Sequence, residues 1–339
     1  MKKRILSLSR WAQERGIHYT KAFRMMQDGA IDAQRFGRNW FVIEEVDIPE
    51  APGIILTLFT HAGGAGKTSL ARDLGFEMAS RGQRVLLVDV DPQANLSAWF
   101  GVMEVQEEET LLGLLEKNLE PTPRPILQNL DLIPGHVELA RGELLVGHLA
   151  AQQPDILFRL RYALEKQRNH YDLILVDSLP SLGSLAAIAG LAGDGLLIPV
   201  ELSLKGLQAL PTVFSIAGRY ADSLRRMRLW SGGSFVRGII PTGTDRTASG
   251  RHILERLSQM VDSIGAPLSP SLVRRPAVYR AAQEAGMPIQ TVGNEEVVAE
   301  YKALGDWFVK AVLQPLENQE GVVASRTPRL KAGACSPRS

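Results

Sequence analysis

The chain has 339 residues, of which 45% are hydrophobic and 22% are charged, and its formal net charge is +1. This balance is ordinary for a folded protein and argues against general disorder. The length is sufficient for one large α/β domain and a small additional module. Because the net charge is near zero, any affinity for nucleic acid has to come from local basic patches.

Simple counts exclude several kinds of protein. The single cysteine, Cys335, cannot form a disulfide framework, an iron–sulfur cluster or a cysteine-type zinc site. No run of about 18 apolar residues occurs, and the basic start at residues 2–4 has no apolar stretch after it. Neither a membrane span nor secretion is indicated, so we expect a cytoplasmic protein.

Residues 1–46 are predicted to form a separate small module. Ser7 or Ser9 is suited to cap a first helix, residues 19–30 predict a second helix, and residues 38–43 predict a short strand. Two short helices followed by a hairpin-like end are typical of a helix-turn-helix or winged variant.

This module is locally cationic, because only Glu14, Asp28 and Asp32 oppose its basic residues up to position 43. The stretch over residues 11–42 resembles the small DNA-binding modules of excisionases and MerR-type regulators. The alternative is a small helical cap with a solvated basic face. The resemblance implies DNA contacts from basic side chains, for which the candidates are Lys21, Arg24, Arg35 and Arg38.

The rest of the chain is predicted to be an α/β domain. Residues 47–53 have the proline and glycine content of a linker. Continuous apolar runs then alternate with helix-length segments, which is typical of a mostly parallel sheet with helices on both faces. We expect the domain to span residues 54–315, with a final helix over 295–313 and a disordered tail at 316–339. The apolar runs lie at residues 54–59, 85–90, 130–134, 171–177, 195–200 and 235–241.

A glycine-rich turn, THAGGAGKTS over residues 60–69, connects the first apolar run to a helix-compatible stretch. Glycines allow backbone N–H groups to close around a phosphate, and the following helix N-terminus adds a favourable field. Lys67 is suited to neutralise phosphate charge, and the Thr68 hydroxyl to complete a Mg²⁺ shell. His61 replaces the first glycine of the standard G-x-x-x-x-G-K-[ST] pattern. The predicted phosphate cradle consists of Gly63, Gly64, Ala65, Gly66, Lys67, Thr68 and Ser69.

Carboxylates stand at the ends of two later apolar runs. Asp89 and Asp91 lie in the sequence DVDPQ, and Asp177 ends the run over residues 171–177. Ligands collect at the carboxyl ends of strands in an open α/β sheet, so we expect these side chains beside the glycine-rich turn. Of Asp89 and Asp91, one is suited to support Mg²⁺ through water and the other to orient an attacking water. Asp177 is suited to reach the Mg²⁺ shell.

The three motifs together resemble the ParA/MinD family of deviant-Walker ATPases. In that family D-x-D-P-Q is the first switch, which implies a hydrolytic role for Asp91 and leaves Asp89 to the metal. Residues 178–183 resemble the second switch, matching it at Pro180 and Gly183. The resemblance covers residues 54–313 and implies a parallel sheet, ATP and Mg²⁺ as cofactors, and an ATP-bound homodimer.

One position departs from the family pattern. The signature lysine, which reaches the phosphate of the partner subunit in the family, falls at Ala62. Alanine cannot supply that charge, and the neighbouring His61 is mostly neutral near pH 7. We therefore expect slow turnover, or dependence on a partner or on another cation supplied in trans.

Partition ATPases of this family also bind DNA non-specifically through basic residues on the body, and such contacts go to phosphate. By family position the candidates are Arg246, Arg274, Arg275 and Arg280.

The leading hypothesis is a nucleoid-associated ATPase for plasmid or chromosome partition, reset by a ParB-like centromere-binding partner. The alternative is a nucleotide-sensing transcriptional regulator that reads an operator through residues 1–46. A MinD-like membrane-positioning role is disfavoured, because residues 326–339 are broken by prolines and poor in large apolar residues. Metabolic relatives need bridging cysteines, which the chain lacks, and small-molecule ligases would not explain the N-terminal module.

Overall fold

The computed structural model describes residues 2–8, 12, 15–31, 33–36, 39–46, 52–150, 153–230, 232–244 and 247–314. The chain divides into two compact units, residues 1–50 and 51–339.

The first unit contains a small antiparallel sheet and a helix. The strand order is β1 (Lys2–Ser7), β3 (Asn39–Val46) and β2 (Ala33–Phe36). Helix α2 (Tyr19–Gln27) begins after His18, whose ring nitrogen accepts the Thr20 N–H. A small core forms where side chains of the helix, the sheet and the intervening segment meet, and it is made of Leu8, Ala12, Ala22 and Val42.

The second helix and the short strand expected in this unit are confirmed, and the strand extends to Val46. The first expected helix falls mostly on residues 9–11 and 13–14, outside the described part of the chain. Strand β1 is not predicted by the sequence, because its partner β3 lies far along the chain and no turn joins the two. The helix-turn-helix assignment therefore stays a prediction.

The second unit is built on a seven-stranded sheet in the order β10-β9-β4-β8-β5-β7-β6. All neighbours are parallel except β6, which pairs antiparallel with β7. Strands β4, β5 and β8 are buried along their whole length, which explains their continuous apolar sequences. The strands are β4 (Ile54–Leu58), β5 (Val85–Asp89), β6 (Arg124–Leu127), β7 (Leu130–Ile133), β8 (Leu173–Asp177), β9 (Leu196–Glu201) and β10 (Val236–Thr242).

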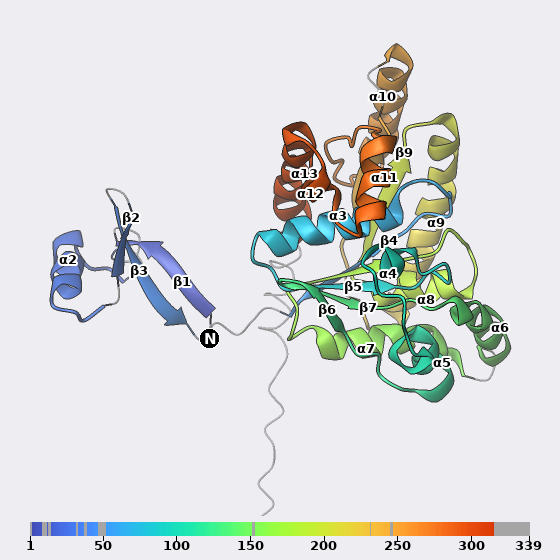
Figure 1. Cartoon of the computed structure of the whole chain (residues 1–339), viewed down its shortest axis with the longest axis horizontal. Helices are drawn as coiled ribbons and strands as arrows, with labels where there is room; N and C mark the ends of the chain where they lie inside the picture. The colour runs from blue at the N-terminus through green and yellow to red at the C-terminus, as the bar shows by residue number, and fades with distance from the viewer. Residues whose placement is uncertain are drawn as a thin grey trace, which may run out of the picture. The chain divides into compact units, whose positions relative to one another are not determined.

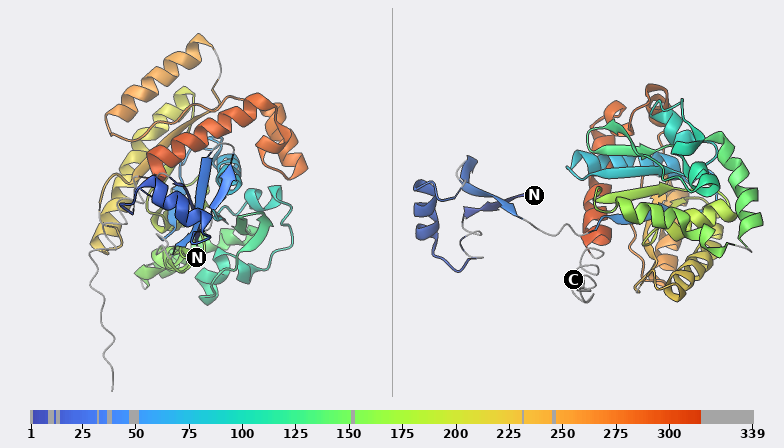
Figure 2. Two further views of the ribbon diagram at one scale, coloured as in Figure 1. Left: turned by 90° about the vertical axis from the view of Figure 1, so that its left-hand side faces the viewer. Right: turned by 90° about the horizontal axis from the view of Figure 1, so that it is seen from below.

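Helices cover both faces of this sheet (Figure 1 and Figure 2). Helices α3, α11, α12 and α13 pack on one face, and α5 to α8 pack on the other, continued by α9 and α10 over β9 and β10. The helices are α3 (Lys67–Ser80), α4 (Asn95–Trp99), α5 (Leu111–Lys117), α6 (Ala140–Leu149), α7 (Arg159–Gln167), α8 (Ser184–Ala192), α9 (Leu204–Arg226), α10 (Ala248–Asp262), α11 (Pro276–Ala285), α12 (Ile289–Val292) and α13 (Glu295–Phe308). Short 3₁₀ turns lie at Glu107–Glu109, Val137–Leu139 and Pro154–Phe158, and a π turn at Val309–Leu313 follows α13.

The predicted α/β class is confirmed for this unit, and each of the six predicted apolar runs contains a strand. The exception is β6, which the sequence does not predict because its four residues include Pro125 and are only partly buried. The sheet brings the carboxyl ends of β4, β8 and β5 together, since Leu58 pairs with Asp177 and Asp177 with Asp89. Across the described residues, no helix is both long and apolar enough to cross a membrane.

Candidate nucleotide site

The glycine-rich turn leads from β4 into the N-terminus of α3. Gly64 and Gly66 have φ of +85° and +81°, a left-handed conformation in which a side chain would be strained. Gly66 is the N-cap of α3 and supplies no side-chain cap, so the first N–H groups of the helix remain available. The Thr242 hydroxyl donates to the Ala65 carbonyl at 3.0 Å and ties the turn to β10. This arrangement is suited to hold a phosphate.

Lys67 is buried in the first turn of α3. Its Nζ donates to the Thr60 carbonyl at 3.2 Å, at the end of β4. Burial lowers the pKa of Lys67, while the carboxylates of Asp177 and Asp91 act in the opposite direction. The ammonium group is therefore held inside the turn and faces two of the predicted carboxylates.

Asp177 ends β8 and is fully buried. Burial raises the pKa of Asp177 well above its ordinary value, and the Asp89 carboxylate adds to this, while Thr68 and Lys67 favour the charged form. Within the described part of the chain, neither carboxylate oxygen has a well-formed hydrogen bond. A buried carboxylate whose charge Lys67 and Thr68 balance only in part, beside a phosphate cradle, fits a bound divalent cation, which would supply further positive charge.

Asp89 is equally buried, but the chain itself satisfies its oxygens. Its Oδ2 accepts the Ser97 N–H at 3.0 Å and the Ser97 hydroxyl at 2.7 Å, and its Oδ1 accepts the Asp91 N–H at 3.2 Å. Burial raises the pKa of Asp89 to about 6, against the effect of these bonds. A Cβ on Gly135 would lie 2.8 Å from the Asp89 carboxyl carbon, so only glycine fits there. Asp89 thus organises the loop that carries Asp91.

Asp91 lies in that loop and is partly buried. Its Oδ1 accepts the Gln93 N–H at 2.9 Å, and its backbone carbonyl accepts the Ala94 N–H at 2.8 Å. Ala94 has φ of +48°, the left-handed region that a non-glycine residue rarely adopts. The loop is therefore folded tightly around the Asp91 side chain.

The segment after Asp177 joins β8 to α8. The Ser178 hydroxyl donates to the Leu58 carbonyl at 2.6 Å, which links the segment to the end of β4. The Gly183 N–H donates to the Ser181 hydroxyl at 2.9 Å, and Pro180 is exposed. Both predicted switch segments thus lie at the same edge of the sheet as the glycine-rich turn.

At the signature lysine position, the Ala62 N–H donates to the Thr60 hydroxyl at 3.3 Å. The neighbouring His61 has a buried Nδ1 for which the described residues supply no hydrogen-bond partner. Position 62 itself presents only a methyl group.

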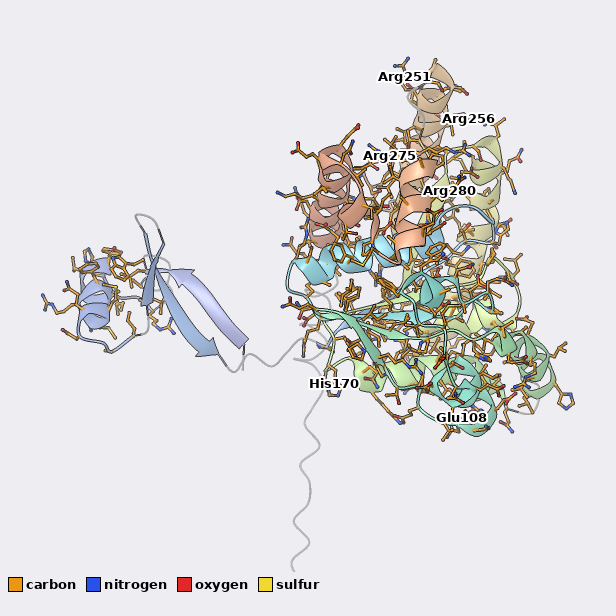
Figure 3. The ribbon with its side chains drawn as sticks, in the orientation of Figure 1. Glu108, His170, Arg251, Arg256, Arg275 and Arg280 are labelled. Carbon is orange, nitrogen blue, oxygen red and sulfur yellow. The ribbon has the colours of Figure 1, made fainter. Side chains whose placement is uncertain are left out.

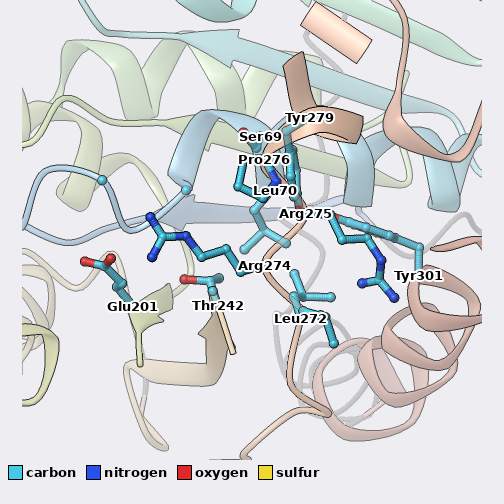
Figure 4. A pocket seen from close by; sticks show the side chains of 14 residues that line it. Ser69, Leu70, Glu201, Thr242, Leu272, Arg274, Arg275, Pro276, Tyr279 and Tyr301 are labelled. Atoms are coloured by element: carbon cyan, nitrogen blue, oxygen red, sulfur yellow. The ribbon is translucent and has the colours of Figure 1, made fainter. Parts of the chain in front are cut away.

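A cavity of about 280 Å³ opens beside the glycine-rich turn (Figure 4). Its walls come from α3, the end of β9 and β10, the segment before α11, and α13. Sequence reasoning missed this cavity, because its lining comes from segments that are far apart in the chain. In Figure 4, Arg274 extends toward Glu201 across the cavity. The other side chains that define it are Leu70, Thr242, Leu272, Tyr279 and Tyr301.

The predicted DNA-contacting arginines of the second unit differ in their surroundings. Arg274 and Arg280 are exposed. Arg275 is mostly buried and pairs with Glu300 at 2.7 Å and Glu296 at 3.3 Å, so its charge is already neutralised. Arg246 lies outside the described residues.

Helix α10 carries two further exposed arginines, Arg251 and Arg256, which sequence reasoning missed (Figure 3). They carry no motif, and a spacing of five residues does not mark one helix face, so the sequence held no clear signal for them. In the first unit, Lys21 and Arg24 are exposed on α2. The Arg35 side chain and the whole of Arg38 lie outside the described part of the chain.

Comparison with known proteins agrees with this geometry. A family model described as AAA domain matches residues 53–225. The chain is 44% identical to the Thermus thermophilus protein named "Probable plasmid-partitioning protein ParA", over 94% of this chain and 97% of that protein. The chain belongs to the ParA family of deviant-Walker ATPases.

Solved structures share the fold of this chain over most of its length. Apo McdA from Cyanothece has a TM-score of 0.64 at 23% identity, covering 75% of this chain and 98% of that one. A Cyanothece McdA variant in complex with ATP has the same TM-score at 22% identity, covering 76% and 96%. At this identity the likeness concerns the fold alone.

Proposed function

We propose that this chain is a ParA-type ATPase that partitions plasmid or chromosomal DNA by cycling between a MgATP-bound dimer and a released state. The observation that carries the proposal is the meeting of the glycine-rich turn, Lys67 and the buried Asp177 carboxylate at one edge of the sheet. The 44% identity to the Thermus protein over nearly the full length of both chains supports the partition branch.

The residues present fit MgATP. The backbone N–H groups of residues 63–69 hold the phosphates, and Lys67 neutralises their charge. Thr68 and Asp177 hold the Mg²⁺, which neutralises phosphate charge when bound, and Asp89 supports it through water. The described residues contain no cluster of three or more His, Cys, Asp or Glu side chains that could hold a metal, so the remaining ligands come from the nucleotide and water. The nucleoside occupies the cavity beside the turn.

Asp91 is the residue that orients the attacking water. It is anchored through one carboxylate oxygen by the Gln93 N–H, and its charge acts against the lowering of the Lys67 pKa by burial. The tight loop around it, held by Asp89 and Ser97, keeps its side chain at the phosphate end of the site.

Hydrolysis by this chain is slow in the absence of a partner. Ala62 stands at the position of the family's signature lysine, so the ATP-bound dimer lacks one cation at the phosphates of each site. A ParB-like centromere-binding protein supplies the stimulation that resets the switch.

The MgATP dimer binds DNA through phosphate contacts from exposed arginines of the second unit. Arg251 and Arg256 on α10 join Arg280 in this role, and Arg246 belongs to the same set by family position. Arg274, a candidate from the sequence, lines the cavity assigned to the nucleoside instead. Arg275 contributes little, because Glu300 and Glu296 already neutralise it.

The test is Mg²⁺-dependent ATP hydrolysis by wild type, Lys67→Ala and Asp91→Ala. Lys67→Ala should lose ATP binding, and Asp91→Ala should bind ATP but lose hydrolysis, by about a hundredfold. Lys205→Ala, an exposed lysine on α9, is the matched control and should behave as wild type. A Lys67→Ala protein that hydrolyses ATP at the wild-type rate would sink the assignment of this site.

A second candidate function is a nucleotide-sensing transcriptional regulator or autorepressor. It is favoured by the separate first unit, in which Lys21 and Arg24 are exposed on α2. Deleting residues 1–46 distinguishes the two functions. Loss of sequence-specific binding supports the regulator, whereas retained, ATP-dependent, non-specific binding supports partition alone.

A further inference from the structure

Glu143 on α6 makes an unusual contact with the start of α8. Its Oε1 accepts the Ser184 N–H at 2.5 Å, and its Oε2 accepts the Leu185 N–H at 3.0 Å. Helix α8 has no side-chain cap of its own, because its N-cap residue is Gly183. A carboxylate from a distant helix thus satisfies two of the N–H groups that a helix N-terminus leaves open.

Gly183 is required for this contact. Its φ is −80°, so the backbone conformation does not demand glycine. A Cβ there would lie 2.0 Å from the Glu143 Oε1 and 2.7 Å from its carboxyl carbon, and no other residue supplies the nearest atoms. The glycine of the predicted second switch therefore leaves room for the Glu143 carboxylate.

The same contact fixes one end of the segment 178–183. The other end is fixed where the Ser178 hydroxyl bonds the Leu58 carbonyl, directly before the glycine-rich turn. Between these anchors the segment has only local bonds, such as that from the Gly183 N–H to the Ser181 hydroxyl. The end of segment 178–183 that leads into α8 is therefore positioned by Glu143.

We propose that Glu143 is a positioning residue for ATP hydrolysis, which holds segment 178–183 in register with the nucleotide by capping α8. The proposal rests on the proposed ATPase function. Nucleotide binding depends mainly on the glycine-rich turn and Lys67, so loss of Glu143 acts on kcat rather than on affinity. Misplacement of a catalytic segment by about 1 Å is sufficient for a large loss of rate.

The first test compares Glu143→Gln and Glu143→Ala with Glu138→Gln, a matched control in which an exposed glutamate pairs with Arg141. Glutamine keeps the size of the side chain, but an NH₂ group replaces one of the two carboxylate oxygens. A donor then faces a backbone N–H, which is also a donor, so one of the two hydrogen bonds is lost. Both Glu143 variants should lower kcat by about tenfold or more, with the dissociation constant of a fluorescent ATP analogue within about twofold of wild type. A kcat equal to that of Glu138→Gln would overturn the proposal.

The second test uses Gly183→Ala and the double variant Gly183→Ala/Glu143→Ala. Because the three atoms nearest to the added Cβ all belong to the Glu143 carboxylate, the single glycine variant should lose as much kcat as Glu143→Ala, and the double variant no more than either. Losses that multiply would show that Gly183 serves another purpose and would overturn the proposal.

A third measurement separates this inference from the ATPase function. In nucleotide-free protein, Glu143→Gln should speed amide hydrogen exchange at Ser184 and Leu185 and in segment 178–183, whether or not the protein hydrolyses ATP. Unchanged exchange there overturns the role of Glu143. If the wild type does not hydrolyse MgATP but the variant still shows the faster exchange, only the proposed function is overturned.

Discussion

At the scale of single residues, the two buried carboxylates of the site differ in how far the chain compensates their charge. Asp89 accepts three hydrogen bonds from its own loop, whereas the Asp177 oxygens have no well-formed bond within the described residues. An uncompensated buried charge destabilises the folded state unless a ligand neutralises it. Asp177 is thus held at a cost in stability that binding of a cation would offset.

The first prediction is that Asp177→Asn stabilises the nucleotide-free protein. Since burial raises the pKa of Asp177, the folded state binds the proton more tightly than the unfolded state, and stability falls as the pH rises above the ordinary carboxyl pKa. At pH 8 the variant should gain about 1–2 kcal/mol in the free energy of unfolding, measured by urea denaturation without Mg²⁺. It should also lose Mg²⁺-dependent ATP binding. A variant less stable than wild type at pH 8 contradicts the assignment.

The second prediction concerns Ala62. Ala62→Lys restores the cation that the family places at this position, and its backbone N–H can keep the bond to the Thr60 hydroxyl. We expect an ATP-dependent dimer that is tighter and a turnover that is faster by about tenfold, because a charge aimed at the phosphates stabilises the transition state. Sedimentation and phosphate release measure the two effects. If neither changes, another group already compensates for the missing lysine, and the slow turnover expected from Ala62 is wrong.

At the scale of elements, a buried ionic cluster fastens the amino end of strand β4. The Asp194 carboxylate accepts hydrogen bonds from Arg168 at 2.6 Å, Arg161 at 3.2 Å and the Ile55 N–H at 2.9 Å. The two arginines also donate to backbone carbonyls, Arg168 to Gly53 and Arg161 to Gly193, each at 2.7 Å. The cluster therefore joins the start of β4, helix α7 and the segment before β9.

The third prediction is that Asp194→Asn destabilises the protein by about 3 kcal/mol, because two buried guanidinium groups lose their buried counter-charge and keep only the partly exposed Glu165. Burial acts to raise the pKa of Asp194, but the two arginines outweigh it and hold that pKa below its ordinary value. The stabilisation is therefore present above about pH 4 and is lost as the pH falls through the lowered pKa. Urea denaturation between pH 2 and 7 should show a smaller acid loss of stability in the variant than in wild type, because only the contribution of Asp194 is removed. An equal acid loss in both would rule out this role of Asp194.

The elements show what a sequence can predict. Strands β4, β5 and β8 are buried on both faces, so their apolar runs are unmistakable, and the motifs at their ends predict the edge at which the site lies. Strand β6 and the cavity beside the turn could not be predicted, because they depend on partly exposed residues and on segments far apart in the chain. Glu143 carries no motif, and only the spatial approach of α6 to α8 reveals it.

At the scale of the whole molecule, each of the two units offers a basic surface, and each surface predicts a different kind of DNA binding. Arg251 and Arg256 are exposed on α10 of the ATPase unit, and Lys21 and Arg24 on α2 of the first unit. Phosphate contacts are independent of base sequence and weaken with salt, whereas base contacts carry specificity. Substitutions in one unit should therefore change one property and leave the other.

The fourth prediction is that Arg251→Ala/Arg256→Ala weakens non-specific DNA binding by the ATP-bound protein. Each lost phosphate contact should reduce the slope of log K against log salt concentration by about 0.9, so the pair should reduce it by about 1.8. Arg225→Ala is the matched control, because that arginine is already engaged by Asp222 and Trp230. Fluorescence anisotropy on random duplex DNA across a salt series measures the slopes. Because phosphate contacts do not read bases, any preference contributed by residues 1–46 should survive in the α10 variant. An unchanged slope would show that the non-specific phosphate contacts do not come from Arg251 and Arg256.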